Sequence, residues 1–175
     1  MKIVLHVCCG VCAAGVVERL ISEGHQVFGL FYNPNIHPLE EYNRRLEVAY
    51  QVAKELNFPL AEIPYTPEEW FKETGSLANE PDGGKRCEIC FRLRLKSAYL
   101  YMEDNKYDAF TTTLTISPRK SADVINRVGR EVGGDRFLVR DFKKKEGFKR
   151  ATELAKKLDL CRQDYCGCVY SRRAR

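Results

Sequence analysis

Cysteine is the residue type whose number and spacing stand out in this sequence. The 175 residues contain eight cysteines in three groups: Cys8, Cys9 and Cys12; Cys87 and Cys90; and Cys161, Cys166 and Cys168. Clustered cysteines favour metal binding or redox chemistry in a reduced compartment over a framework of structural disulfides. The chain opens without the apolar segment of a secretory signal. It also lacks the roughly 18 consecutive apolar residues of a membrane span. We therefore expect a cytoplasmic protein.

The first two groups have the spacing of metal ligands. Cys87 and Cys90 form a C-x-x-C pair at the expected start of a helix, where free N–H groups and the helix dipole stabilise thiolates. Such a pair serves either a redox disulfide or one half of a metal site. Cys8 and Cys9 fall on a strand-to-helix turn, which Gly10 keeps tight, and can supply the other half. Four sulfur ligands suit zinc or an iron–sulfur cluster, and the consecutive pair favours the cluster.

The third group contains a C-x-C pair. A disulfide between Cys166 and Cys168 closes a small ring that Gly167 permits, and its strain makes it easy to reduce again. This spacing favours a dithiol that cycles between two redox states. The competing interpretation is that one of the C-terminal cysteines, Cys161 included, completes a metal site with Cys12.

Histidines are few. His6 falls in an apolar strand and is expected to be a core residue with its hydrogen bonds satisfied. His37 follows a strand in a loop and is a candidate proton donor.

Basic residues give the chain a formal net charge of +5. The runs at 143–145 and 172–175 are typical of solvated surface. Together with other residues they are also candidates for phosphate contacts and for stacking on an unpaired base. These further residues are Arg119, Lys120 and two aromatic residues that we expect to be exposed, Tyr32 and Tyr165.

These groups must be positioned by an alternation of strands and helices. Five strand candidates lie at 3–7, 26–32, 60–63, 109–116 and 137–139, with helical patterns between them. This order predicts a single α/β domain over residues 1–175, with a parallel sheet of about five strands, helices on both faces and a Cys-rich C-terminal tail. Ligands of such sheets lie beyond the carboxyl ends of the strands. If the tail returns to that edge, all three cysteine groups converge there.

Four motifs, taken in order, resemble the cobalamin-independent epoxyqueuosine reductases of the QueH type. They span nearly the whole chain: His6–Cys12, Cys87–Arg94, Thr112–Pro118 and Gln163–Cys168. One departure is Gly10-Val11, where we expect a small residue followed by proline, and it should alter the stiffness of the turn more than ligation. The resemblance implies a HUP-like (Rossmann-like) fold related to the PP-loop enzymes, with a Cys-rich turn in place of their phosphate loop.

The resemblance also implies an oxidoreductase that converts epoxyqueuosine to queuosine at the wobble position of tRNA, the last step of queuosine formation. The implied partners are a tRNA anticodon stem-loop and an electron donor. The implied ligands of a 4Fe-4S cluster are Cys8, Cys9, Cys87 and Cys90, and the implied redox-active disulfide joins Cys166 and Cys168.

Three residues keep open roles under this interpretation. Cys12 or Cys161 is a candidate ligand of an additional iron, and Asp164 is a candidate oxygen ligand or acid. Two other functions remain as alternatives. One is a zinc-stabilised RNA-binding module without catalysis. The other is a PP-loop-like tRNA sulfur transferase, which the missing phosphate loop disfavours.

Overall fold

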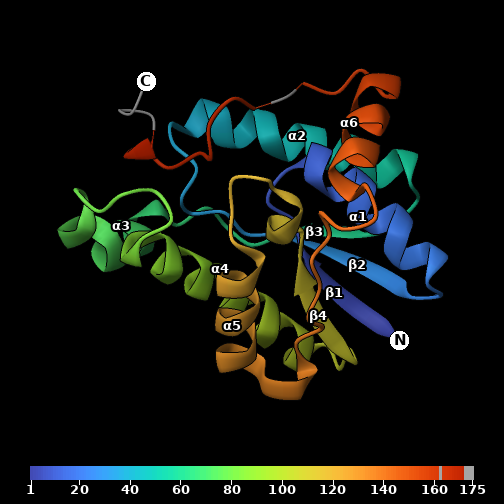
Figure 1. The fold of residues 1–175 in the computed structure, drawn as a ribbon, viewed down its shortest axis with the longest axis horizontal. Helices are drawn as coiled ribbons and strands as arrows, with labels where there is room; N and C mark the ends of the chain where they lie inside the picture. Colours follow the sequence, from blue (N-terminus) through green and yellow to red (C-terminus); the bar gives the residue numbers. More distant parts are fainter. Residues whose placement is uncertain (162, 172–175) are drawn as a thin grey trace.

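The computed structural model describes residues 1–161 and 163–171. Strands and helices alternate through the first two thirds of the chain, and helices follow (Figure 1). The strands are β1 (Lys2–His6), β2 (Gln26–Phe31), β3 (Leu60–Glu62) and β4 (Ala109–Thr112). The α-helices are α1 (Gly10–Ser22), α2 (Leu39–Glu55), α3 (Pro67–Thr74), α4 (Lys85–Asp104), α5 (Ala122–Gly133) and α6 (Gly147–Lys157). Short 3-10 helices are η1 (Gly75–Leu77), η2 (Thr113–Ile116) and η3 (Gly134–Arg136).

The sheet is parallel, with strand order β3-β2-β1-β4. The predicted α/β class is therefore confirmed, but the described sheet has four strands rather than about five. The segment at 137–139 contributes a single bridge, between Phe110 and Phe137. The predicted strand at 109–116 ends early because the hydroxyl of Thr112 accepts a hydrogen bond from the Leu114 N–H at 3.1 Å, which starts η2.

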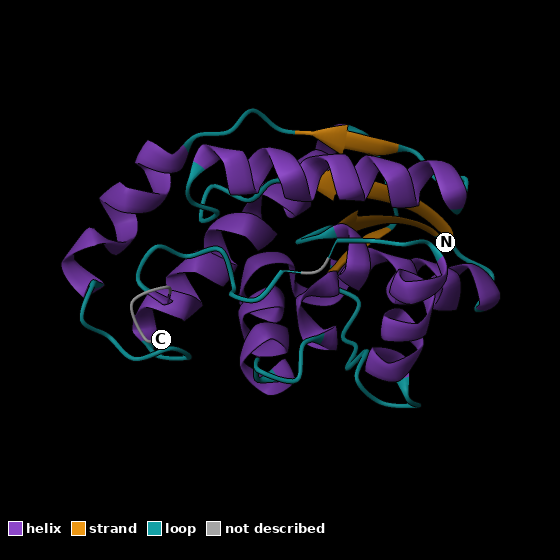
Figure 2. Cartoon of the chain, turned by 90° about the horizontal axis from the view of Figure 1, so that it is seen from above, coloured by secondary structure: helices purple, strands orange, loops and turns teal. Residues whose placement is uncertain are grey.

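Helices cover both faces of the sheet, as predicted. Alternate residues of a strand point to opposite faces, so Ile3 and Leu5 join a core with α1, α2 and α6, while Val4 joins a second core with α4 and α5. Figure 1 shows these two groups of helices, and Figure 2 shows the helices making up most of the molecule around the short sheet. In the part of the chain that the structure describes, no helix is long and apolar enough to cross a membrane.

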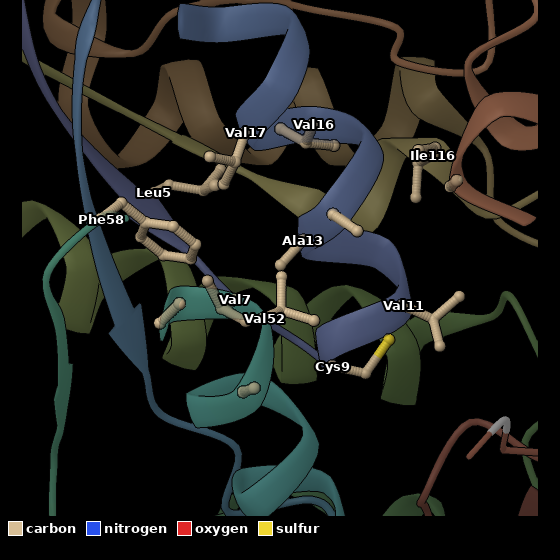
Figure 3. Close-up of a cluster of buried hydrophobic side chains, with 14 of the residues drawn as sticks. Leu5, Val7, Cys9, Val11, Ala13, Val16, Val17, Val52, Phe58 and Ile116 are labelled. Carbon is tan, nitrogen blue, oxygen red and sulfur yellow. The ribbon is translucent and has the colours of Figure 1, made fainter. Parts of the chain in front are cut away.

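Helix α1 is held tightly at the end that carries cysteines. Figure 3 shows Cys9 at its N-terminal end, beside an apolar cluster that includes Val16 and Val17 from α1 itself. Burial of each large apolar side chain stabilises the fold by about 1.5–3 kcal/mol. Gly10 lets α1 approach α2 closely, because a Cβ atom there would lie 2.5 Å from the Val48 carbonyl oxygen. The position of the first turn of α1 is thus fixed by packing on β1 and α2.

Candidate functional site

A cavity of about 940 Å³ lies at the carboxyl edge of the sheet. Its lining includes Cys8, Asn33 and Leu114, which follow the carboxyl ends of β1, β2 and β4. Six of the eight cysteines line it: Cys8, Cys12, Cys87, Cys90, Cys166 and Cys168. The predicted convergence of the three cysteine groups is therefore confirmed.

The N-terminal cysteines form the tightest sulfur group. The sulfurs of Cys8, Cys9 and Cys12 all lie within 4.8 Å of one another. Cys9 is the N-cap of α1 and accepts a hydrogen bond from the Cys12 N–H at 3.4 Å, while Thr113 donates its hydroxyl to the Cys8 sulfur at 3.2 Å. Hydrogen bonds from Cys12 and Cys9 lower the pKa of the Cys8 thiol well below its usual value. The turn thus brings together three sulfur atoms that could hold a metal, whereas the sequence singled out two of them as a half-site.

The C-x-x-C pair lies at the start of α4. Cys87 is in the first turn, where its sulfur accepts a hydrogen bond from the Gly83 N–H at 3.2 Å. Cys90 is buried in a small cluster with Trp70 and Cys168. Burial raises the pKa of both thiols of the pair. Within the described residues, neither Cys87 nor Cys90 belongs to the group of sulfurs that lie within 4.8 Å of one another.

The two thiols of the C-x-C pair differ in their surroundings. Cys166 is exposed, whereas Cys168 is buried, with 5% of its surface accessible. Gly167 has a φ of +103°, a left-handed conformation that glycine adopts without strain. A hydrogen bond from the Cys168 thiol, and the nearby charge of Lys120, hold the pKa of Cys166 well below its usual value, and the same bond raises the pKa of Cys168. The two thiols thus differ both in exposure and in the direction in which their pKa values are shifted.

The remaining residues of the tail are divided between two pockets. Asp164 lines the main cavity, and its backbone carbonyl accepts a hydrogen bond from Arg119 at 3.5 Å. Cys161 is exposed and lines a smaller pocket with Cys9. Gln163 lines both pockets. Cys161 therefore lies close to the N-terminal cysteine turn, because it shares this smaller pocket with Cys9.

The two histidines singled out by the sequence are both largely enclosed. His6 is completely buried, with Nε2 3.2 Å from the Tyr32 carbonyl oxygen and Nδ1 2.9 Å from the Thr112 hydroxyl. Burial lowers the pKa of His6 to about 4, so the prediction of a satisfied core histidine is confirmed. The His37 ring packs against two aromatic rings that also contact each other, with its centroid 5.0 Å from Trp70 and 4.7 Å from Phe71. Burial lowers the pKa of His37 as well.

The candidates for nucleic-acid contacts are only partly where the sequence suggested. Three of them line the cavity: Arg119, Lys120 and Tyr165, although Tyr165 is half-buried rather than exposed as expected. Tyr32 does not, because it is buried and donates its hydroxyl to Glu69 at 3.0 Å, so the expectation that it is exposed is wrong. Of the run at 143–145, Lys143 donates to the carbonyl oxygens of Thr115 and Lys120 at 3.1 and 3.3 Å and so fixes this loop. The run at 172–175 lies outside the described residues.

Three buried arginines that the sequence analysis did not single out line the cavity: Arg45, Arg86 and Arg94. Arg94 donates to the Cys90 carbonyl oxygen at 3.2 Å and to the side-chain oxygen of Asn33 at 3.4 Å. Arg45 donates to the carbonyl oxygens of Tyr165 and Cys166. The signal in the sequence was an arginine on the apolar face of each helix, where a charge costs free energy unless it is paired.

Sequence comparison relates nearly the whole chain to one family. The sequence model of the family described as "Epoxyqueuosine reductase QueH" matches residues 3–174. A protein of that name from Streptococcus pyogenes is 37% identical over 179 residues, which cover 97% of this chain and 70% of the relative. Another from Dehalococcoides mccartyi is 37% identical over 175 residues, which cover 97% of this chain and 92% of the relative.

Solved structures share the fold at low sequence identity. A predicted subunit of a tRNA methyltransferase from Methanocaldococcus jannaschii has a TM-score of 0.60 and 13% identity, covering 89% of this chain and 74% of its own. The U34-tRNA thiolase NcsA from Methanococcus maripaludis, solved with its [4Fe-4S] cluster, has a TM-score of 0.52 and 11% identity. That match covers 94% of this chain and 58% of the thiolase. These likenesses confirm the predicted HUP-like α/β fold.

Proposed function

The chain belongs to the epoxyqueuosine reductase QueH family and reduces epoxyqueuosine to queuosine in tRNA, and we propose that it does so with an iron–sulfur cluster and a dithiol that share one cavity. The observation that carries this proposal is the gathering of six cysteines from three distant segments on one cavity. Its volume of about 940 Å³ lies within the range of small-molecule sites, so a nucleoside extruded from the anticodon fits beside the sulfurs.

The donor set fits a cluster. Thiolates select soft metals and iron–sulfur clusters, and the sulfurs here accept hydrogen bonds from backbone N–H groups and a hydroxyl, as cluster ligands do. A single zinc ion with sulfur bonds of about 2.3 Å would need all four sulfurs within about 4 Å of one another. The two cysteine groups do not form one such tight set, which supports a larger metal group bridging them.

The proposed ligands of a 4Fe-4S cluster are two cysteines from each group: Cys8, Cys9, Cys87 and Cys90. When bound, the cluster would supply electrons one at a time from an external donor. Cys12 is the best-placed candidate for an additional iron because its sulfur belongs to the tight group and lines the cavity. Cys161 is a weaker candidate, since it lines the smaller pocket, and Asp164 offers a carboxylate oxygen or a proton on the main cavity.

The dithiol can supply the electrons and protons that the reaction consumes. Both C–O bonds of the epoxide break, a C=C bond forms, and the oxygen leaves as water, which requires two electrons and two protons. Oxidation of Cys166 and Cys168 to a disulfide releases two electrons and two protons, and reduction by the external donor restores the pair. Both thiols line the cavity, but Cys166 is exposed and Cys168 is buried, so Cys166 is proposed as the sulfur that meets the substrate.

The proposed partner is the anticodon stem-loop of a tRNA. Arg119 and Lys120 line the cavity and offer positive charge to phosphates, while Tyr165 offers a ring on which an unpaired base can stack. Phe148, which is 38% exposed and also lines the cavity, offers a second ring.

The proposal is tested by turnover on tRNA that carries epoxyqueuosine, with queuosine measured after digestion to nucleosides. The full-length protein, prepared anaerobically and given a chemical reductant, should form queuosine. The Cys166→Ser variant should keep its iron, because Cys166 is not a proposed ligand, but should lose at least about 100-fold in turnover, as expected when a reacting group is removed. Full activity of Cys166→Ser would contradict the dithiol role.

A further inference from the structure

The backbone of the Cys166-Gly167-Cys168 turn is held by an arginine from a distant helix. Arg45, on α2, has only 4% of its surface accessible. One terminal nitrogen of its guanidinium donates to the Cys166 carbonyl oxygen at 3.1 Å, and the other donates to the Tyr165 carbonyl oxygen at 3.0 Å. The guanidinium also lies 5.2 Å from the centroid of the Tyr165 ring. One side chain thus binds two successive peptide groups at the start of the turn.

The charge of Arg45 is compensated within α2. Its Nε donates to the Glu41 carboxylate at 2.6 Å, and Glu41 is itself buried, with 7% of its surface accessible. A buried arginine paired in this way has a fixed direction, because the planar guanidinium uses all three nitrogens in one arrangement. The two terminal nitrogens of Arg45 that face the turn, which form a planar fork, are therefore held rigidly.

Other contacts complete the attachment of the turn. The backbone N–H of His37 donates to the Gly167 carbonyl oxygen at 2.8 Å, and the Tyr165 hydroxyl donates to the backbone carbonyl oxygen of His37. A Cβ atom at Gly167 would lie 2.9 Å from Ile36 Cγ1 and 3.1 Å from an Arg45 nitrogen. Three successive carbonyl groups, at residues 165 to 167, are thus bound by donors from the segment that begins before α2 and from α2 itself.

We propose that Arg45 is the positioning residue of the redox turn, Cys166-Gly167-Cys168: its two terminal nitrogens hold the backbone so that Cys166 is exposed, while Cys168, which also lines the cavity, stays buried beside Trp70 and Cys90. The structure shows this difference in exposure: Cys166 is exposed, whereas Cys168 is 5% accessible and belongs to the buried cluster with Trp70 and Cys90. That these thiols carry the reaction rests on the proposed function. The division of their exposure is a property of the turn alone.

Lysine cannot replace Arg45 in this role. A lysine keeps the positive charge beside Glu41, but its single ammonium group cannot bind two carbonyl oxygens and the carboxylate in the same planar arrangement. Loss of the fork leaves the Tyr165 and Cys166 carbonyl groups without these donors, and the turn opens more often. Cys168 then becomes accessible through local opening, while the already exposed Cys166 changes little.

The test is the ratio of the alkylation rates of Cys166 and Cys168. Fully reduced, full-length protein is treated anaerobically with iodoacetamide, and each site is followed by peptide mass spectrometry, with the melting temperature recorded in parallel. The wild-type ratio should exceed about tenfold, because a buried thiol reacts only through local opening. In Arg45→Lys and Arg45→Met the ratio should fall at least about threefold, through faster alkylation of Cys168.

A control arginine, more exposed than Arg45, lies at the opposite end of the sheet. Arg136 also donates to two successive carbonyl oxygens, those of Tyr107 and Asp108, at 2.6 and 2.7 Å, and pairs with Glu103 at 3.2 Å. Arg136→Met should leave the ratio unchanged. An unchanged ratio in Arg45→Lys, or an equal fall in Arg136→Met, would overturn the proposal. The ratio is measured without tRNA, so its outcome is independent of whether Cys166→Ser loses turnover.

Discussion

The side-chain amide of Gln163 donates a hydrogen bond to the sulfur of Cys9 at 2.7 Å, across 154 residues of sequence. This contact joins the C-terminal tail to the first turn of α1 and brings the tail back to the carboxyl edge of the sheet. Together with the binding of the redox turn by Arg45, it explains why the C-terminal cysteines reach the N-terminal group although they are far apart in the chain.

Replacement of a proposed cluster ligand should remove the metal. We expect Cys87→Ala and Cys9→Ala each to lose most of the iron of an anaerobically reconstituted sample, because a cluster held by four thiolates is released when one is removed. Iron content per chain is the measurement. Cys166→Ser is the matched control and should keep its iron. Retention of full iron by Cys87→Ala would refute the ligand assignment.

Addition of a single methyl group to the redox turn should impair it. Gly167 has a φ of +103°, and a Cβ atom there would contact Ile36 and Arg45. Gly167→Ala should cost about 1–3 kcal/mol of stability and most of the turnover. Gly24→Ala is the control, since Gly24 has a φ of +82° but nothing within 4 Å of the added Cβ. It should cost about 1 kcal/mol and leave turnover unchanged. Equal turnover in the two variants would show that the shape of the redox turn does not matter.

The close contact between α1 and α2 gives a second comparison of glycines. In Gly10→Ala the new Cβ would lie 2.5 Å from the Val48 carbonyl oxygen, so α1 must move away from α2 and displace Cys9. We expect a loss of about 1–3 kcal/mol in the free energy of unfolding, together with less bound iron. Gly75 has a φ of −59°, and a Cβ atom there would have nothing within 4 Å. Gly75→Ala should therefore raise the free energy of unfolding by about 0.4–1 kcal/mol. Denaturant unfolding measures both, and normal stability of Gly10→Ala would refute the tight contact.

Protonation of His37 should be suppressed by its burial against Trp70 and Phe71. Burial lowers its pKa from the ordinary value of 6.5. The unfolded chain therefore binds the proton more tightly than the folded protein. The contribution of His37 to the free energy of unfolding is therefore largest above pH 6.5, where the ring is neutral in both states. It falls as the pH drops below 6.5, because the unfolded chain takes up the proton first. NMR titration of the His37 ring should give a pKa below that of a model peptide. A value at or above 6.5 would restore His37 as a charged proton donor near neutral pH.

Much of the fold could be predicted because it depends on local patterns. The apolar runs and helical periodicity define a parallel sheet with helices on both faces, and the carboxyl edge of that sheet is where Cys8 and Leu114 lie. The lengths of the last strands could not be predicted in this way. The hydroxyl of Thr112 ends β4 by binding the backbone two residues on, and Phe137 pairs at one position only. Such side-chain competition with the sheet leaves the apolar pattern unchanged.

The parts of the site that sequence reasoning missed depend on long-range partners. Arginines such as Arg45 and Arg94 are expected on the solvated face of a helix. Both are buried here, because they find hydrogen-bond acceptors in other segments, 121 and 61 residues away. Cys12 joins the sulfurs of Cys8 and Cys9 because the first turn of α1 directs all three toward one another. Neither arrangement can be obtained from spacing alone.

The central claim is that these cysteines hold an iron–sulfur cluster beside a dithiol. Its most direct test is the metal and acid-labile sulfide content of the full-length protein purified anaerobically. A 4Fe-4S cluster gives about four iron atoms and about four sulfides per chain, with a further iron if Cys12 or Cys161 holds one. One zinc ion per chain and no sulfide would contradict it.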